Sequence, residues 1–247
     1  MSTKKRIVII GATSAIAEQC ARQWVQQGPV DLLLLGRNQR RLEVVAADLL
    51  VRSPTSEIKI VVANFLDPEL IKITAVALFE KGPIDIALIA HGSLPEQMDC
   101  QNDLGLCRET LEVNAISPVL YSEALAGQMA KLNRGTIALI SSVAGDRGRK
   151  SNYVYGSAKG LVTRYAQGLQ HRFAGSGVHI TLVKPGPTDT PMTAGMKGKF
   201  SSSEEVAKII TQGIENQKLV IYAPGKWRLI MMVIRHLPSF IFNKLNI

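Results

Sequence analysis

The sequence is poor in the residues that cross-link or metallate small proteins. Its 247 residues include only three cysteines, which form no C-x-x-C pair and cannot all pair with one another. This usage excludes a disulfide framework and fits a reducing cytoplasm. The four histidines are scattered, with neither an H-E-x-x-H motif nor a Cys/His spacing, so we expect no metal held by the protein.

Long apolar runs and long basic runs are also missing. The apolar stretch IVII, after MSTKKR, is too short for a signal peptide. The net charge of +9 suits nucleic acid, a membrane surface or anionic ligands, but its bases occur in small groups. No basic run is interleaved with aromatic residues, so nucleic acid is not expected as a partner. The predicted location is cytoplasmic, with peripheral contact at the inner face of a membrane as a further option.

The sequence does contain a regular alternation of strands and helices. Near-continuous apolar runs are typical of strands buried on both faces of a parallel sheet. Seven occur, at 6–10, 31–35, 58–63, 84–90, 136–141, 178–183 and 218–222. Helix-length segments lie between them, at about 15–27, 39–51, 67–80, 101–131, 153–173 and 203–216. The pattern predicts an α/β fold, a doubly wound seven-stranded parallel sheet with helices on both faces (Rossmann-type). We expect one domain over residues 1–225 and an apolar, basic extension over 226–247.

The segment GATSAIA, residues 11–17, lies where a dinucleotide-binding fold keeps its phosphate loop. Gly11 can take the positive φ that starts such a turn. Alanines replace two of the usual glycines, but they fall in the first helical turn, where alanine is favourable. Phosphate is attracted by the free amides of a helix start, here those of Thr13, Ser14, Ala15 and Ile16. A plain strand–helix corner is the alternative.

The end of the second predicted strand bears on the choice of cofactor. An acidic residue near this point suits the ribose 2′-hydroxyl of NAD, whereas an arginine suits a 2′-phosphate. Gly36 leaves the position without a carboxylate, and Arg37 offers a permanently charged, planar fork. We therefore expect NADP(H) in preference to NAD(H), the alternative being a solvated basic helix start.

Tyr155 and Lys159 lie four residues apart on a predicted helix and share one face. A tyrosine, with a pKa of about 10, is a weak acid–base group at neutral pH, and a neighbouring ammonium lowers that pKa. Ser142 follows the fifth predicted strand and comes within reach if the loop folds back. Alone, the pair would be an ordinary helix surface.

These residues belong to a longer series of motifs in a fixed order. Gly11 corresponds to the first glycine of T-G-x-x-x-G-x-G, and Asp85 and Gly92 bracket a stretch corresponding to D-x-x-x-N-N-A-G. Asn114 lies in LEVNAISP, and the stretch 185–190 reads PGPTDT, as in P-G-x-x-x-T. With Ser142, Tyr155 and Lys159, the series resembles the short-chain dehydrogenase/reductase family, over about residues 4–222.

The resemblance implies an NAD(P)-dependent oxidoreductase of C=O and CH–OH groups. Tyr155 would give a proton to the carbonyl oxygen while hydride leaves the nicotinamide, and Ser142 would stabilise that oxygen. Lys159 would hold the nicotinamide ribose and lower the pKa of the tyrosine. Asn114 would position a water that links the lysine to solvent.

The resemblance also implies cofactor contacts and an assembly. Thr188 and Thr190 would hold the carboxamide end of the nicotinamide. The remaining expected contacts are Asn64 and Phe65 near adenine, with His91, Gly92, Pro185 and Gly186 along the cofactor. Family members pair through helices corresponding to about 101–131 and 153–173, so a homodimer or homotetramer is implied.

Two departures from the family pattern leave open questions. The N-N-A-G stretch reads Ile89-Ala90-His91-Gly92, so the asparagines that normally brace the sheet are absent. His91 either contacts the cofactor or has a hydrogen-bonded structural role. Lys184, before Pro185, replaces a small polar residue and is expected at the surface or facing phosphate.

The C-terminal segment KWRLIMMVIRHLPSFIFNKLNI lies beyond the family core. Its bases and Pro238 interrupt it too often for a membrane span of about 20 apolar residues. Three alternatives remain: packing on its own core or on a partner, an interfacial helix on anionic lipid, or a lid over a hydrophobic substrate.

The apolar tail, the loop at 11–17 and the AHG at 90–92 are similar to a branch that reduces lipid-linked keto-sugars, such as the decaprenylphosphoryl-2-keto-pentose reductases. The resemblance therefore implies a hydrophobic or lipid-linked carbonyl substrate. The alternatives are steroid-like, acyl or small ketone substrates, a non-catalytic cofactor-binding regulator, or a membrane-tethered scaffold.

Overall fold

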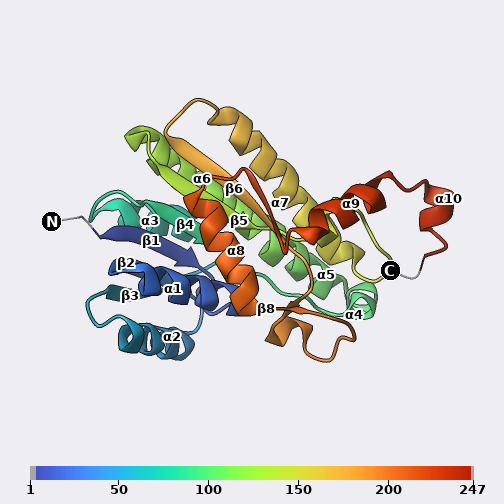
Figure 1. The fold of residues 1–247 in the computed structure, drawn as a ribbon, viewed down its shortest axis with the longest axis horizontal. Coiled ribbons are helices and arrows are strands. Elements are labelled where there is room, and N and C mark those ends of the chain that lie inside the picture. The colour runs from blue at the N-terminus through green and yellow to red at the C-terminus, as the bar shows by residue number, and fades with distance from the viewer. Residues whose placement is uncertain (1–3, 246–247) are drawn as a thin grey trace.

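Seven parallel strands form the central sheet of the computed structural model, which describes residues 4–245 (Figure 1). The strand order is β3-β2-β1-β4-β5-β6-β9. The strands are β1 (Lys5–Ile10), β2 (Val30–Gly36), β3 (Glu57–Val62), β4 (Ile86–Ile89), β5 (Gly135–Ile140), β6 (Val178–Pro185) and β9 (Val220–Ala223). The predicted doubly wound, Rossmann-type sheet is thus confirmed.

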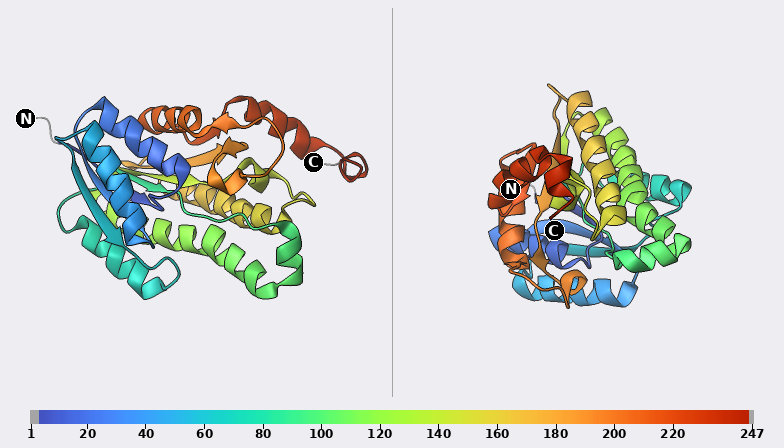
Figure 2. Two further views of the ribbon diagram at one scale, coloured as in Figure 1. Left: turned by 90° about the horizontal axis from the view of Figure 1, so that it is seen from below. Right: turned by 90° about the vertical axis from the view of Figure 1, so that its right-hand side faces the viewer.

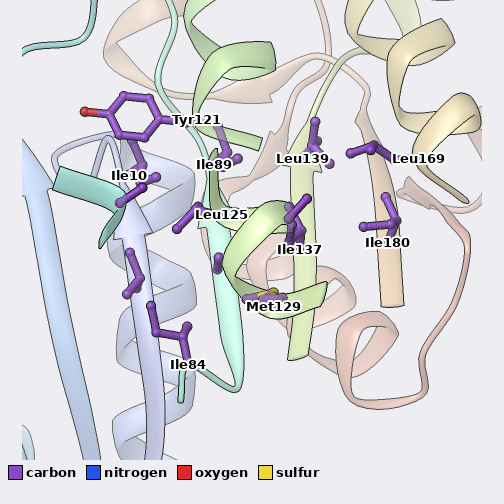
Figure 3. Close-up of a cluster of buried hydrophobic side chains, with 14 of the residues drawn as sticks. Ile10, Ile84, Ile89, Tyr121, Leu125, Met129, Ile137, Leu139, Leu169 and Ile180 are labelled. Atoms are coloured by element: carbon purple, nitrogen blue, oxygen red, sulfur yellow. The ribbon is translucent and has the colours of Figure 1, made fainter. Parts of the chain in front are cut away.

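Helices cover both faces of the sheet because its strands are apolar on both sides. In β1, Val8 and Ile10 belong to one core cluster, and Ile7 and Ile9 belong to the other, as the alternation of a strand requires. One face carries α1 (Ala15–Gln27), α2 (Gln39–Arg52) and α8 (Ser203–Glu215). The other carries α3 (Pro68–Phe79), α6 (Ser117–Leu132) and α7 (Tyr153–Arg172). Figure 3 shows the cluster that contains Ile10, where Leu125 and Met129 of α6 pack over Ile89 and Ile137 of the sheet.

The winding of the sheet reverses at β1, which pairs with β2 on one side and with β4 on the other. Loops that leave neighbouring strands in opposite directions open a crevice at this point, beyond the carboxyl ends of the strands. A small parallel pair, β7 (Thr188–Asp189) with β8 (Ser201–Ser202), lies between β6 and α8 in the chain.

The single helix predicted over 101–131 is wrong. The chain instead forms α4 (Gln97–Asn102), α5 (Leu104–Leu111), a π-helical turn (Glu112–Ile116) and α6. Asp103 ends the first piece because its carboxylate accepts hydrogen bonds from the amides of Gly105 and Leu106 and so caps α5. Pro118 has no N–H for the carbonyl four residues earlier, which belongs to Asn114, and the helix widens there.

The C-terminal segment forms α9 (Lys226–His236) and the short α10 (Ser239–Phe242), drawn in red at one end of the molecule (Figures 1 and 2). Trp227 and Met231 face the body, and the Met231 side chain is fully buried. Arg147 fastens the end of α9, since its Nη1 donates to the carbonyls of Ile234 (2.5 Å) and Leu237 (2.6 Å). The tail therefore packs on its own core along one edge, which is one of the three predicted alternatives.

No helix within residues 4–245 combines the length and apolar character needed to cross a membrane.

Candidate active site

A cavity of about 420 Å³ lies beyond the carboxyl ends of β4, β5 and β6. It collects predicted residues from six separate parts of the chain. Those that line it are Ser14, Ile16, His91, Gly92, Asn114, Ser142, Tyr155, Lys159, Pro185, Gly186, Thr188 and Thr190. The topology of the sheet, rather than proximity in sequence, brings them together.

Tyr155 and Lys159 come from the first two turns of α7. The Lys159 ammonium is buried, lies 5.7 Å from the centroid of the Tyr155 ring and donates to the carbonyl of Ile140 (3.2 Å). Burial lowers the pKa of Lys159 to about 8. The lysine is therefore still mostly charged at neutral pH and loses its charge just above it.

The pKa of Tyr155 moves in the direction opposite to the sequence-based expectation. Burial raises the pKa of Tyr155 to about 12, and the nearby Ser142 hydroxyl only partly offsets this. The lysine does not reverse the shift, because desolvation of the phenolate outweighs every other effect in the cavity. Tyr155 is consequently protonated at neutral pH.

Close backbone packing sets the position of Ser142. The 3₁₀ turn that follows it (Val143–Asp146) lies against α7, where a methyl group on Gly145 would come within 2.6 Å of the Lys159 backbone. The Ser142 hydroxyl also accepts a hydrogen bond from the amide of Ala144 (3.1 Å). The neighbouring Ser141 donates to the carbonyl of Lys159 (2.9 Å) and holds β5 to α7.

Asn114 lies in the π-helical turn and is completely buried. Its Oδ1 accepts from the amide of Ser93 (3.0 Å), and its Nδ2 donates to the carbonyl of Thr110 (2.9 Å). A side chain on Gly92 would come within 2.7 Å of this Oδ1. Asn114 therefore connects the loop after β4, through Ser93, to the end of α5, through Thr110.

His91 has the hydrogen-bonded structural role that was one of its two alternatives. Its Nε2 lies 2.8 Å from the Ser117 hydroxyl, and its ring packs 4.7 Å from that of Phe65. Burial and the charge of Lys159 lower the pKa of His91 to about 3, so the ring is neutral. His91 also forms part of the cavity wall.

The glycine loop, residues 11–17, turns sharply after β1. Gly11 has a φ of 85°, and a methyl group on it would lie 2.6 Å from the backbone nitrogen of His91. The side chain of Ser14 does not cap α1, so the amides of the first turn remain free to bind a ligand. Arg41 donates to the carbonyl of Thr13 (3.2 Å) beside the loop.

Six predicted cofactor residues do not line the cavity: Gly11, Thr13, Ala15, Arg37, Asn64 and Phe65. The first three lie in the glycine loop, and Arg37 is exposed at the end of β2. The Asn64 side chain accepts from the amides of Leu66 and Asp67. The ring of Phe65 is buried in the core, so only its backbone is available to a ligand.

The expectation for Lys184 is wrong. Its side chain is buried and forms an ion pair with Asp146, whose other oxygen accepts from the Tyr222 hydroxyl (2.8 Å). The lysine neither reaches the surface nor lines the cavity. Its partner is 38 residues away, so the local sequence contained no sign of it.

Sequence reasoning missed one wall of the cavity. Arg149, in the loop before α7, lines it together with an apolar group formed by Leu94, Met192, Met196 and Phe200. The basic group at 147–150 was the available signal. The segment 190–203 contains no motif that indicates a function. Only the folded structure shows that some of its side chains line the cavity.

Among residues 4–245, no three His, Cys, Asp or Glu side chains come together as metal ligands.

A family model described as "short chain dehydrogenase" matches residues 5–199. The chain belongs to this family. A short-chain dehydrogenase of this type is an NAD(P)-dependent oxidoreductase, as the sequence predicted. An uncharacterized oxidoreductase of Mycobacterium tuberculosis is 30% identical over 97% of this chain and 96% of the relative. One of Streptomyces coelicolor is 28% identical over 98% and 96% of the two chains.

Solved structures agree with the fold of this short-chain dehydrogenase. An enzyme of the same family from Burkholderia cenocepacia, described as a complex with NADP, covers 100% of both chains with a TM-score of 0.83 and 18% identity. One from Sphingobium yanoikuyae, described as a complex with NADPH, covers 95% of this chain and 97% of its own, with a TM-score of 0.79 and 22% identity.

Proposed function

We propose that this enzyme reduces a carbonyl compound with NADPH and that Tyr155 supplies the proton. The observation that carries the proposal is the convergence of Ser142, Tyr155 and Lys159 on one cavity. A tyrosine whose pKa is about 12 holds its proton at neutral pH and is ready to donate it to a carbonyl oxygen. The Ser142 hydroxyl, which lines the same cavity as Tyr155, would bind the same oxygen.

The remaining site residues prepare this proton transfer. The Lys159 ammonium stabilises the phenolate that remains after donation. Asn114 fixes the loop that carries Gly92 next to the lysine. When bound, the nicotinamide supplies the hydride. The protein orients the carbonyl between Ser142 and Tyr155 and keeps water away from it.

The glycine loop and the cavity wall fit a dinucleotide. The free amides of α1, with Ser14 and Ile16, would hold the pyrophosphate, and Lys159 would hold the nicotinamide ribose. Pro185, Gly186, Thr188 and Thr190 also line the cavity and would receive the nicotinamide. The close approach of Gly11 to His91 leaves no room for a side chain in the turn.

Preference for NADP(H) rests on Arg37, which is exposed beside the glycine loop, with Arg41 nearby. We expect tighter binding of NADPH than of NADH. Replacement Arg37→Ala should weaken NADPH about tenfold or more while leaving NADH unchanged, whereas the exposed control Arg164→Ala on α7 changes neither. Tighter binding of NADH by the native enzyme would refute the preference.

Tyr155→Phe tests the proposed reaction. The variant should lose NADPH oxidation with carbonyl substrates by about 10²-fold or more but bind NADPH normally. Tyr153→Phe, on the same helix but exposed and outside the cavity, is the matched control and should retain activity. Native rates in Tyr155→Phe would refute the role of this residue, and would leave a cofactor-binding regulator as the alternative.

The substrate is proposed to be hydrophobic, because the large apolar side chains of Leu94, Met192, Met196 and Phe200 line the cavity. A lipid-linked keto-sugar is the narrower prediction from sequence, and steroid-like, acyl and small ketones are the alternatives. A turnover screen of these classes with NADPH distinguishes them.

We also propose that the tail contacts an anionic lipid surface. Leu229, Met232 and Val233 lie opposite the buried edge of α9 and are each more than half exposed. Phe240 on α10 is 72% exposed. The sequence contains no acidic residue after Glu215, whereas four bases lie within 226–247. An apolar stripe with basic flanks is typical of an interfacial helix.

Vesicle sedimentation tests the lipid contact. The full-length enzyme should pellet with vesicles of phosphatidylglycerol and phosphatidylcholine, and less with phosphatidylcholine alone. Combined replacement of Leu229 and Val233 by Glu should abolish pelleting, while Val51→Glu on the distant α2 should not. Equal, negligible pelleting in all cases would exclude the contact.

A homodimer is the proposed assembly, formed through the helices that the family uses for pairing. Within α5, the π-helical turn and α7, several large apolar side chains remain exposed, namely Leu104, Leu111, Ile116, Tyr153 and Leu161. Light scattering on the purified enzyme should give twice the chain mass of 26.9 kDa or a higher multiple, and a monomer would exclude the assembly.

A further inference from the structure

Arg149 is a charged side chain in the cavity wall whose hydrogen-bonding capacity is largely unused. It lies between the 3₁₀ turn and α7, in the loop that joins Ser142 to Tyr155. Its Nε is buried and has no partner within residues 4–245. Its Nη2 reaches only the Met231 sulfur, at 3.3 Å, which is a weak acceptor. The buried Nε of this guanidinium therefore has a free N–H donor.

Within the described part of the chain, residues 4–245, no carboxylate forms an ion pair with Arg149. Burial lowers the pKa of Arg149, and the nearby Asp146 acts in the opposite direction. That carboxylate is already occupied, since Lys184 binds one oxygen and Tyr222 binds the other. No Asp or Glu is among the residues that line the cavity, whereas Lys159 and Lys197 add two further positive charges. A half-buried cation without a partner is unfavourable, and an anion in the cavity would remove that cost.

The loop that carries Arg149 is held in place from outside the cavity. Arg147, two residues earlier, binds the carbonyls at the end of α9, and its guanidinium lies 3.7 Å from the centroid of the Phe242 ring. Met231, the contact of Arg149 itself, is fully buried. The guanidinium is thus pre-positioned at the cavity wall, which lowers the entropy cost of binding an anion.

We propose that Arg149 binds an anionic group of the substrate, a carboxylate or a phosphate, and so selects charged over neutral carbonyl compounds. A planar guanidinium binds either group through paired hydrogen bonds. The apolar wall formed by Leu94, Met192, Met196 and Phe200 receives the hydrophobic body of the same molecule. The substrate class is therefore an amphiphilic carbonyl compound with one anionic group. This inference rests on the proposed function, whose cavity it uses.

Equilibrium binding tests the inference without turnover. Octanoate, octyl phosphate and octanol are titrated calorimetrically into the enzyme saturated with NADP⁺, so that the cofactor site is closed to them. The native enzyme should bind at least one of the two anions about tenfold or more tightly than octanol. The two anions distinguish a carboxylate site from a phosphate site. Equal binding of all three compounds would overturn the proposal.

Variants locate the binding at Arg149. Arg149→Gln should abolish the preference for anions while leaving octanol binding unchanged, and Arg149→Lys should retain only part of it because the planar fork is lost. Lys150→Gln is the matched control, since it removes the same charge from the adjacent, exposed position. Equal losses in Arg149→Gln and Lys150→Gln would indicate general charge attraction and refute a site.

Kinetics separate this inference from the proposed reaction. With NADPH, 3-oxooctanoate is compared with its methyl ester, and 7-oxooctyl phosphate with 7-oxooctanol. Arg149→Gln should lower kcat/KM for the charged member of the preferred pair about tenfold and spare the neutral member. Reduction of neutral ketones with no effect of Arg149 would leave the reaction intact and reject the inference. Anion binding at Arg149 without any NADPH oxidation would support the inference and refute the proposed reaction.

Discussion

Trp227 of the C-terminal helix lies directly against Gly186 in the wall of the active-site cavity. A methyl group on Gly186 would overlap the indole, with Nε1 as its nearest atom. Gly186 follows β6, and its amide donates to the carbonyl of Ala223 at the end of β9 (2.9 Å). The tail is therefore in physical contact with the site.

Gly186→Ala should displace Trp227 and destabilise the fold by about 1–3 kcal/mol, the usual cost of overpacking. The expected signs are a lower midpoint of thermal unfolding and faster proteolysis of residues 226–245. Gly168→Ala is the control, because this exposed glycine in α7 has free space around it, and alanine there should stabilise by up to about 1 kcal/mol. If Gly186→Ala has the same midpoint of thermal unfolding as the native enzyme, the indole moves aside without destabilising the fold. That result would contradict the prediction.

The buried ion pair of Lys184 and Asp146 should be strongly coupled. Lys184→Met leaves a carboxylate buried without a counter-ion and should lower the free energy of unfolding by about 3–5 kcal/mol. Adding Asp146→Asn should recover most of this loss, since the amide oxygen still accepts from Tyr222. Urea unfolding of the single and double variants measures the coupling.

An exposed ion pair provides the comparison. Arg108 and Glu112 form an ion pair one turn apart on the surface, and Arg108→Met should leave the free energy of unfolding nearly unchanged because solvent screens this pair. Similar costs for Lys184→Met and Arg108→Met would contradict the assigned importance of the buried pair.

NADPH binding should weaken as the pH rises through about 8. The pKa of Lys159 is lowered to about 8 by burial, so its protonated fraction falls above that pH. If only the ammonium form binds the cofactor, the Kd for NADPH rises about tenfold between pH 7 and pH 9. Fluorescence titration measures it. Lys159→Met should remove the increase of Kd with pH, whereas Lys81→Met, at an exposed position, should retain it. A Kd that does not change with pH in the native enzyme would exclude Lys159 as the cause.

The glycine loop needs glycine at one position only. Gly11→Ala forces a side chain into the left-handed region, at about 1–2 kcal/mol, and against the backbone of His91, so NADPH binding should be lost. Ala15→Gly lies in the first turn of α1 and should cost at most about 1 kcal/mol while NADPH still binds. Calorimetric titration of both variants checks this, and normal binding by Gly11→Ala would refute the role of the turn.

Much of the molecule follows from local sequence. The central strands were readable because they are apolar on both faces, as the split of β1 between two core clusters shows. The edge strand β3 has exposed Glu57 and Lys59 but keeps enough apolar residues to be recognised. The spacing of Tyr155 and Lys159 placed both on one helix face, and Gly11 marked the turn after β1. These features depend on neighbours within one or two turns of the chain.

Tertiary structure determined the burial, the pKa values and the pairing of side chains whose partners are distant in sequence. Lys184 is buried because Asp146, 38 residues away, neutralises it. The pKa of Tyr155 is raised because the cavity walls, gathered from separate loops, exclude water from it. Arg149 stands without a counter-ion because Lys184 and Tyr222 occupy the carboxylate nearby. Sequence determined which groups are present and which face of each element they share. The folded structure determined their protonation states and their binding partners. The reason is that desolvation and competition for partners exist only once the chain has folded.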